Sequence, residues 1–214
     1  MSDKTKVHTV YKLPDGARVP SVTTILGILN KPALLEWAYQ CGLRGEDYKL
    51  VRDDAASVGT LAHLMIMNHL EGGQADTSEY SQDDIDRAEN CLIKFWDWEK
   101  EHTLEPILVE TPLVSETFKF GGTIDCLCTL DGHLTLVDFK TGRAIYPEYF
   151  YQLAAYERLL AEKGHQVESA RILRIGRTED EGFEERTMVN LDKHFQIFLH
   201  CQNIYESQKE LRRK

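Results

Sequence analysis

The sequence predicts an α/β protein in which a mixed central β-sheet is flanked by helices, with an N-terminal helical elaboration. Two observations lead to this class. Apolar residues at helical spacing dominate the chain up to about residue 105, and three β-rich runs follow. A further helical segment then separates these runs from one or two later β-rich runs and a last helix. Elements in this order pack with helices against the faces of a shared sheet.

Length and composition indicate one globular domain. The chain has 214 residues, of which 42% are hydrophobic and 28% are charged, as in a domain with one core and an elaborated periphery. We expect a helical part at about residues 1–105, a core at about 106–190 and a C-terminal helix at 191–214. No apolar run approaches the roughly 20 residues of a membrane span, and the N-terminus has no apolar signal core. We therefore expect no membrane partner.

The cysteines are scattered and form no CxxC pair. There are five, namely Cys41, Cys91, Cys126, Cys128 and Cys201. An odd, scattered set argues against disulfides and indicates a reducing compartment. We expect a cytoplasmic protein, in the host cytoplasm if a phage encodes it.

The charge is distributed unevenly along the chain. The net charge of −10 by itself argues against a nucleic-acid partner. Residues 46–110 hold 16 acidic and 5 basic side chains, whereas residues 140–177 hold 7 basic and 4 acidic side chains. This pattern is compatible with a local nucleic-acid groove on an acidic body, and an ordinary solvated mixture of charges explains it equally well.

The N-terminal segments are expected to form a small hairpin and then helices. The hairpin spans the first 20 residues, with a turn at residues 14–16. Ser21 is a candidate N-cap for a short helix, and Pro32 is placed to open the next helix in its first turn.

Two longer helices are expected before the β-rich runs. In the segment 53–70, a single apolar stripe is formed by Val58, Leu61, Ala62, Met65 and Ile66. If that stripe packs on the sheet, His63 lies at its edge. After a polar, turn-rich linker, a helix is expected at 83–102. It carries Trp96 and Trp98, which are two positions apart and cannot share a face; we expect at least one of them in the core.

The sheet begins with three β-rich runs. The run 107–115 contains Pro112, which favours an edge strand or a bulge. The run 118–130 leads into an Asp131-Gly132 turn, and the run 134–140 follows directly.

The rest of the chain alternates helix, strand and helix. An amphipathic helix is expected at 147–163, with Gly164 at its C-terminal cap. Strands are expected at 169–175 and 183–189, on either side of an acidic turn, before the C-terminal helix.

Three charged side chains come together if the second and third runs pair about the Asp-Gly turn. Residues two apart on a strand point the same way, so Asp138 and Lys140 share a face, with Phe139 on the other. Pairing would bring Asp125 close to Asp138. Two carboxylates this close repel each other unless a cation lies between them.

Such a set is chemically complete for phosphodiester hydrolysis. Hard divalent ions such as Mg²⁺ favour oxygen ligands, and they orient and acidify water for attack at phosphorus. A lysine beside the ion can activate that water and stabilise the transition state. An isolated Asp-x-Lys, however, is far more often a solvated face of a strand.

The order and spacing of several short motifs resemble the PD-(D/E)xK nuclease superfamily. The motifs are Gly59-Thr60-Leu61-Ala62-His63, Gly121-Gly122-Thr123-Ile124-Asp125, Asp138-Phe139-Lys140-Thr141-Gly142 and Gln152-Leu153-Ala154-Ala155-Tyr156. They are most similar to the RecB-like and Cas4-like exonuclease branch, which includes phage-type exonucleases and the mitochondrial genome-maintenance exonuclease. The resemblance covers about residues 20–190 and implies a restriction-endonuclease-like core.

The resemblance implies a metal site and a catalytic set. The metal ligands would be His63, Asp125, Asp138 and the main-chain carbonyl of Phe139, holding one or two Mg²⁺ or Mn²⁺ ions. The catalytic residues would be Asp125, Asp138 and Lys140, with Lys140 activating the attacking water. Imidazole suits softer ions than Mg²⁺, so His63 favours tolerance of Mn²⁺. The clustered C-terminal cysteines of Cas4-like nucleases are missing, and we expect no iron–sulfur cluster.

Further residues are implied as nucleic-acid contacts. Gln152, Tyr156 and Thr141 would hold the substrate backbone near the site. Similar PSVTTIL stretches in related proteins place hydroxyls near the nucleic acid, which points to Ser21, Thr23 and Thr24; helix capping alone is an equal alternative. Glu110 lies where many members carry an acidic residue near the metal.

The implied activity is that of a metal-dependent DNA exonuclease acting on ends or single strands, in recombination, repair or end processing. A single-strand-annealing or recombination protein is a candidate partner. Two alternatives belong to other classes. One is a catalytically silent nucleic-acid-binding or scaffold protein of the same fold. The other is a structural zinc site formed by His63, Cys126 and Cys128, which lacks a fourth ligand.

Overall fold

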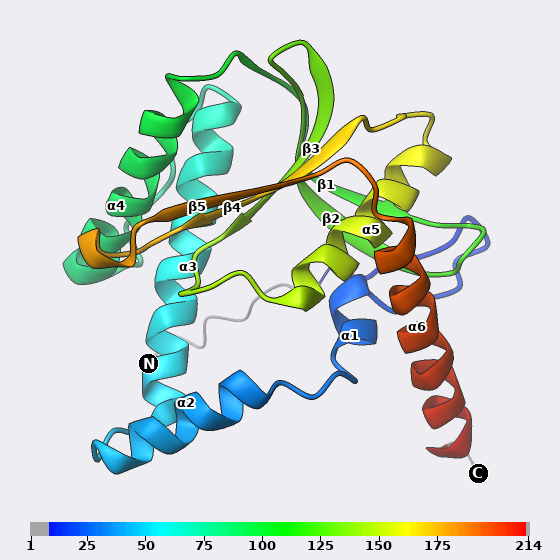
Figure 1. Ribbon diagram of the computed structural model, residues 1–214, viewed down its shortest axis with the longest axis horizontal. Coiled ribbons are helices and arrows are strands. Elements are labelled where there is room, and N and C mark those ends of the chain that lie inside the picture. Colours follow the sequence, from blue (N-terminus) through cyan, green and yellow to red (C-terminus); the bar gives the residue numbers. More distant parts are fainter. Residues whose placement is uncertain (1–8, 213–214) are drawn as a thin grey trace.

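The computed structural model describes residues 9–212 and contains one five-stranded sheet of order β1-β2-β3-β4-β5 (Figure 1). The strands are β1 (Leu104–Val114), β2 (Gly121–Leu130), β3 (His133–Lys140), β4 (Ser169–Ile175) and β5 (Phe183–Met188). Only β3 and β4 pair in parallel, and the other neighbours are antiparallel. The predicted mixed sheet is confirmed.

Helices cover both faces of the sheet (Figure 1). They are α1 (Val22–Leu26), α2 (Pro32–Leu43), α3 (Tyr48–Leu70), α4 (Gln82–Glu99), α5 (Pro147–Glu162) and α6 (Asp192–Arg212), with a short 3₁₀ turn at Glu179–Glu181. On one face, α1, α5 and α6 bury one apolar cluster, while α3 and α4 bury a second cluster on the other. The α5 crossover between β3 and β4 explains why these two strands are parallel.

The helix starts follow from local capping chemistry. Ser21 Oγ accepts a hydrogen bond from the Thr24 N–H at the start of α1, and Pro32 stands in the first turn of α2, as predicted. The predicted start of α3 at residue 53 is wrong. The helix begins at Tyr48 because the Asp47 side chain caps the Lys49 N–H. Helix α4 ends at Glu99 rather than at residue 102.

The apolar stripe and the tryptophans of these two helices lie as expected. Val58, Leu61, Ala62, Met65 and Ile66 are all buried. Trp98 is buried, whereas Trp96 is partly exposed and donates from Nε1 to His69 Nδ1. Trp98 therefore belongs to the core and Trp96 to the surface.

The strands differ from the predicted runs mainly at their ends. β1 is an edge strand, where a proline such as Pro112 is tolerated. Its register shifts between Pro106 and Leu108. β2 begins at Gly121, not at residue 118, because the chain turns through Lys119 with φ of 60°. The turn residues Asp131 and Gly132 both have positive φ, as a tight hairpin requires.

Of the predicted N-terminal hairpin, the described part shows an antiparallel bridge between Lys12 and Arg18, and residues 1–8 lie outside the described residues. The last helix, α6, is described to Arg212. None of the described helices combines the length and apolarity needed to cross a membrane.

Gly122 is expected to be essential for the packing of α5 on β2. A Cβ at this position would lie 2.5 Å from Tyr156 Cε1, inside the buried cluster. We predict that Gly122→Ala lowers the free energy of unfolding by about 1–3 kcal/mol, as measured by urea denaturation. Gly42→Ala is the control because a Cβ there meets nothing within 4 Å; in helix α2 it should be neutral or stabilising by up to ~1 kcal/mol. Equal losses for both variants would contradict this assignment.

Candidate active site

The regular alternation of β2 is broken at Ile124 and Asp125. Cys126 and Cys128 pack in the α3–α4 cluster, whereas Ile124 and Leu127 both pack in the cluster under α5. Positions three apart share a face only where a strand is irregular. The pairing of β2 with β3 correspondingly ends at Cys126, which is opposite Val137.

At this break, the Asp125 side chain replaces a ladder hydrogen bond. Asp125 Oδ2 accepts a hydrogen bond of 2.8 Å from the Phe139 N–H. This bond fixes the Asp125 carboxylate beside the last residues of β3. The predicted approach of Asp125 to the Asp-x-Lys segment is therefore found, through a side-chain contact rather than through a regular pair.

Asp138 and Lys140 lie together at the end of β3. The Asp138 side chain is 1% exposed and the Lys140 side chain 16%, and Lys140 Nζ forms an ion pair with Asp138 Oδ2. Apart from this contact with Lys140, neither carboxylate oxygen of Asp138 has a hydrogen-bond partner within the described part of the chain. A fully buried carboxylate without hydrogen-bond donors is costly unless a cation stabilises it.

Burial dominates the electrostatics of both carboxylates. It raises the pKa of Asp138 to about 6, opposed by the Lys140 ammonium and assisted by the charge of Asp125. The pKa of Asp125 is also raised by burial, while Lys140 and the Phe139 N–H oppose the shift. A positive charge placed between the Asp125 and Asp138 carboxylates would lower the pKa of both groups.

His63 approaches this pair from the other face of the sheet. Its Nδ1 is 3.9 Å from Asp125 Oδ2, and its ring packs edge-on against Phe139 with centroids 6.3 Å apart. Gly59, one helical turn earlier, allows this approach, because a Cβ there would lie 2.8 Å from Thr141 Oγ1. The glycine of the Gly-x-x-x-His motif thus allows α3 to pack closely against the end of β3.

The donors present fit a hard divalent cation. Within residues 9–212, no three His, Cys, Asp or Glu side chains form a ready-made metal site, and Lys140 contacts one of the Asp138 oxygens. The other Asp138 oxygen has no partner, and carboxylate oxygens are the ligands that Mg²⁺ and Mn²⁺ prefer. Cys126 and Cys128 are completely buried in the α3–α4 cluster, and nothing in their surroundings favours the zinc alternative.

Gln152 and Tyr156 form one unit on α5. Gln152 Nε2 donates to Tyr156 Oη over 2.7 Å. Tyr156 is 4% exposed, and burial together with the nearby Asp138 carboxylate raises its pKa. The buried Tyr156 packs against Gly122 and lies near Asp138. Gln152 is more accessible than Tyr156.

The N-terminal hydroxyls lie beside the start of β2. Ser21 forms a parallel bridge with Gly121, and its Oγ hydrogen-bonds the hydroxyls of Thr23 and Thr24 over 3.0 and 2.8 Å. Thr23 and Thr24 are exposed. Tyr11 Oη also hydrogen-bonds Thr123 Oγ1 over 2.8 Å, tying this segment to the strand that carries the site. Capping and an exposed hydroxyl cluster therefore coexist here.

Two further side chains border the site. Glu110 has a φ of 44°, and burial and the charge of Asp125 raise its pKa. The Tyr149 ring lies 5.1 Å from Lys140 Nζ, a contact that the sequence analysis missed. Its spacing of three from Gln152 and seven from Tyr156 puts all three on one face of α5, which is the signal that identifies it.

Comparisons with known proteins identify the family of the chain. The family model of the PD-(D/E)XK nuclease superfamily matches residues 32–210. No curated protein sequence matches the chain. Among solved structures, a presumed exonuclease from Eubacterium rectale is similar with a TM-score of 0.51 and 14% identity. The match covers 71% of this chain and 65% of that one, so the chain spans less than two thirds of its length.

A second similar structure is an alkaline exonuclease, LHK-Exo, from Laribacter hongkongensis. It has a TM-score of 0.36 and 13% identity, with 73% of this chain and 91% of that chain covered. At such identities the structural likeness concerns the fold, and the family assignment rests on the family model. The chain belongs to the PD-(D/E)XK nuclease superfamily and has its restriction-endonuclease-like fold.

Proposed function

We propose that the protein is a metal-dependent DNA exonuclease that hydrolyses phosphodiester bonds at DNA ends or in single strands. One observation carries this proposal. The buried Asp138 carboxylate, the partly buried Asp125 carboxylate and one lysine meet where β2 and β3 separate, and an Asp138 oxygen has no hydrogen-bond partner. Buried carboxylates of this kind destabilise the folded protein when no ligand is bound, and they are suited to binding a cation and a phosphate.

His63, Asp125, Asp138 and the Phe139 carbonyl would hold one or two Mg²⁺ or Mn²⁺ ions. A bound ion of this kind supplies charge neutralisation at the phosphate and a more acidic water.

Lys140 would orient and activate the attacking water. Its ammonium is held between the Asp138 carboxylate and the Tyr149 ring, so its position is fixed before substrate binds. With a cation at Asp138, the same lysine would be available to contact the phosphate. Asp125 remains anchored by the Phe139 N–H.

Substrate contacts would come from both sides of the site. Gln152 and Tyr156 hold the strand near the cut bond, and Thr141 adds a phosphate contact at the end of β3. The hydroxyls of Ser21 and Thr24 are close to the start of β2, which supports a backbone contact there. We assign the activity to recombination, repair or end processing in the cytoplasm, with a single-strand-annealing or recombination protein as a candidate partner.

A cleavage assay with end-labelled single- and double-stranded DNA tests the proposed function. We expect degradation with Mn²⁺ or Mg²⁺ and none with EDTA, and the fate of each label distinguishes end-directed from internal cutting. Intact substrates with both metals would contradict the nuclease proposal. Binding without cutting would favour the scaffold alternative.

His63 is expected to set the metal affinity. His63→Ala removes the only imidazole proposed as a ligand, and we predict that about 10–100-fold more Mn²⁺ is needed for half-maximal cleavage. The measurement is a metal titration of the initial rate. His133→Ala is the control, since His133 is 68% exposed at the β2–β3 turn. An unchanged midpoint for His63→Ala would remove this residue from the ligand set.

A further inference from the structure

A groove of about 1090 Å³ lies beside the candidate active site, between α2, the start of α3, the start of α5 and the β4–β5 turn. Its wall includes Gly142 and Tyr149, and the Tyr149 ring lies 5.1 Å from Lys140 Nζ. The groove therefore reaches the proposed catalytic lysine. Pockets for small molecules usually measure about 300–1,000 Å³, so this space lies at the upper end of that range.

The groove wall carries a small excess of cationic over acidic side chains. Five cationic side chains line it, namely Lys31, Arg52, Arg87, Arg143 and Arg177, beside four carboxylates. The chain as a whole carries a net charge of −10. Aromatic rings also line the groove, including Trp37 and Tyr146. Cations interleaved with aromatic rings are the chemistry that binds single-stranded nucleic acid.

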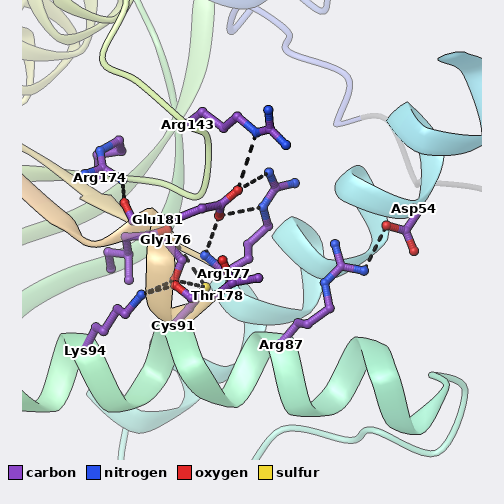
Figure 2. Close-up of polar contacts among 11 residues, drawn as sticks. Asp54, Arg87, Cys91, Lys94, Arg143, Arg174, Gly176, Arg177, Thr178 and Glu181 are labelled. Atoms are coloured by element: carbon purple, nitrogen blue, oxygen red, sulfur yellow. Dashed lines mark hydrogen bonds and ion pairs between the residues drawn. The ribbon is translucent and has the colours of Figure 1, made fainter. Parts of the chain in front are cut away.

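One carboxylate, Glu181, faces two of these arginines (Figure 2). Glu181 Oε1 lies 3.1 Å from Arg177 Nη2 and 3.7 Å from Arg143 Nε, and Oε2 accepts from the Arg177 N–H over 2.8 Å. An anion shared by two guanidinium groups has the geometry of a bound phosphate.

The turn that carries Glu181 is fixed to the body of the protein (Figure 2). Lys94 of α4 donates to the carbonyls of Gly176 and Thr178, and Arg174 donates to the Glu181 carbonyl. A Cβ at Gly176 would lie 2.5 Å from the Glu181 Cβ. The turn is tightly packed, and the Glu181 carboxylate is thereby held at a defined position.

The two arginines are held very differently. Arg177 is 13% exposed and is bonded to Glu181 through its side chain and its backbone, whereas Arg143 is 74% exposed and makes the longer ion pair. Exposed ion pairs contribute little, so Arg143 can exchange its partner at small cost. Arg143 follows Lys140 by three residues and lies within about 11 Å of it along the chain.

We propose that Arg143 and Arg177 form a phosphate-binding subsite for a nucleic-acid single strand, and that Glu181 occupies this subsite in the free protein. On binding, Arg143 exchanges Glu181 for a backbone phosphate a few nucleotides from the cut bond, while Arg177 keeps the turn in place. The subsite rests on the proposed nuclease function and names how its substrate strand is held. Glu181 discriminates against weakly bound anions because each must displace it.

The test is equilibrium binding of a fluorescent DNA single strand of about 16 nucleotides, in EDTA, followed by anisotropy at several salt concentrations. We expect Arg143→Ala to weaken binding about 3–10-fold and to reduce the salt slope by about 0.7, the value for one phosphate contact on a single strand. Arg186→Ala is the control, because Arg186 is 62% exposed on β5, pairs with Glu184 and does not line the groove.

The second arm isolates Glu181. Glu181→Gln should tighten binding about 3-fold more than Glu179→Gln does, although both variants remove one negative charge from the same turn. Thermal denaturation verifies that Glu181→Gln is folded; if it is not, the salt slope of Arg143→Ala decides.

Two results would overturn the subsite. One is an Arg143→Ala protein with the affinity and the salt slope of the wild type. The other is an equal gain in affinity for Glu181→Gln and Glu179→Gln. Cleavage by the wild type would then leave the nuclease proposal intact. A wild type that neither binds nor cuts the strand would overturn both.

Discussion

Replacement of Lys140 by alanine is expected to reduce DNA cleavage by about 10³-fold while leaving DNA binding largely intact. The Lys140 side chain is 16% exposed, in contact with Asp138 and above the Tyr149 ring, so its ammonium is held on two sides. The loss should appear in the single-turnover rate at saturating metal and DNA. Binding in EDTA should change by only a few fold, because one charge among many is removed.

The matched control for this prediction is Lys100→Ala. Lys100 is 72% exposed at the end of α4 and pairs with Asp97, so its removal changes the net charge equally and should leave the rate unchanged. A Lys140→Ala protein that cuts at more than a tenth of the wild-type rate would exclude Lys140 as the group that activates the water. Loss of both binding and thermal stability would instead indicate a structural role.

Asp125→Asn is expected to abolish metal-dependent cleavage and at the same time to stabilise the metal-free protein. The asparagine Oδ1 can still accept the hydrogen bond from the Phe139 N–H. The substitution removes one of two neighbouring buried charges, which are unfavourable without a cation. We expect the cleavage rate to fall about 10²–10⁴-fold. In EDTA the melting temperature should rise by about 2–4 °C, which corresponds to ~1 kcal/mol for a chain of this size.

Metal addition provides an independent readout of the same variant. Mn²⁺ or Mg²⁺ bound only by the folded state should raise the melting temperature of the wild type, and this shift should be reduced in Asp125→Asn. Asp131→Asn serves as the control, since Asp131 caps the β2–β3 turn through the Thr103 N–H and His102. Equal metal-induced shifts in Asp125→Asn and the wild type would mean that the ion binds elsewhere.

The sequence by itself determined the elements and most members of the candidate site. Its signals were local: Ser21 as a cap, Pro32 in a first helical turn, and Asp131-Gly132 as a tight turn. The Asp-x-Lys segment was readable because strand periodicity puts Asp138 and Lys140 on one face. Element ends were the weak point, as at the start of α3, where the Asp47 cap extends the helix by five residues beyond the predicted start.

Only the tertiary structure decided how these residues meet. The break in β2 turns Asp125 to the Phe139 N–H instead of into a regular pair. The missing side chain of Gly59 lets α3 approach Thr141, which brings His63 to the site. These facts depend on contacts between elements far apart in the sequence, which periodicity and capping do not encode.

The groove is the clearest case of information carried by the fold alone. Its wall combines side chains from α2, α3, α4 and the segments that follow β3 and β4. In the sequence, Arg143 and Glu181 are separate charges in oppositely charged stretches. Packing places them against each other, because the β4–β5 turn is anchored on α4 next to the end of β3. The sequence therefore determined which groups the protein carries, and the fold decided which of them act together.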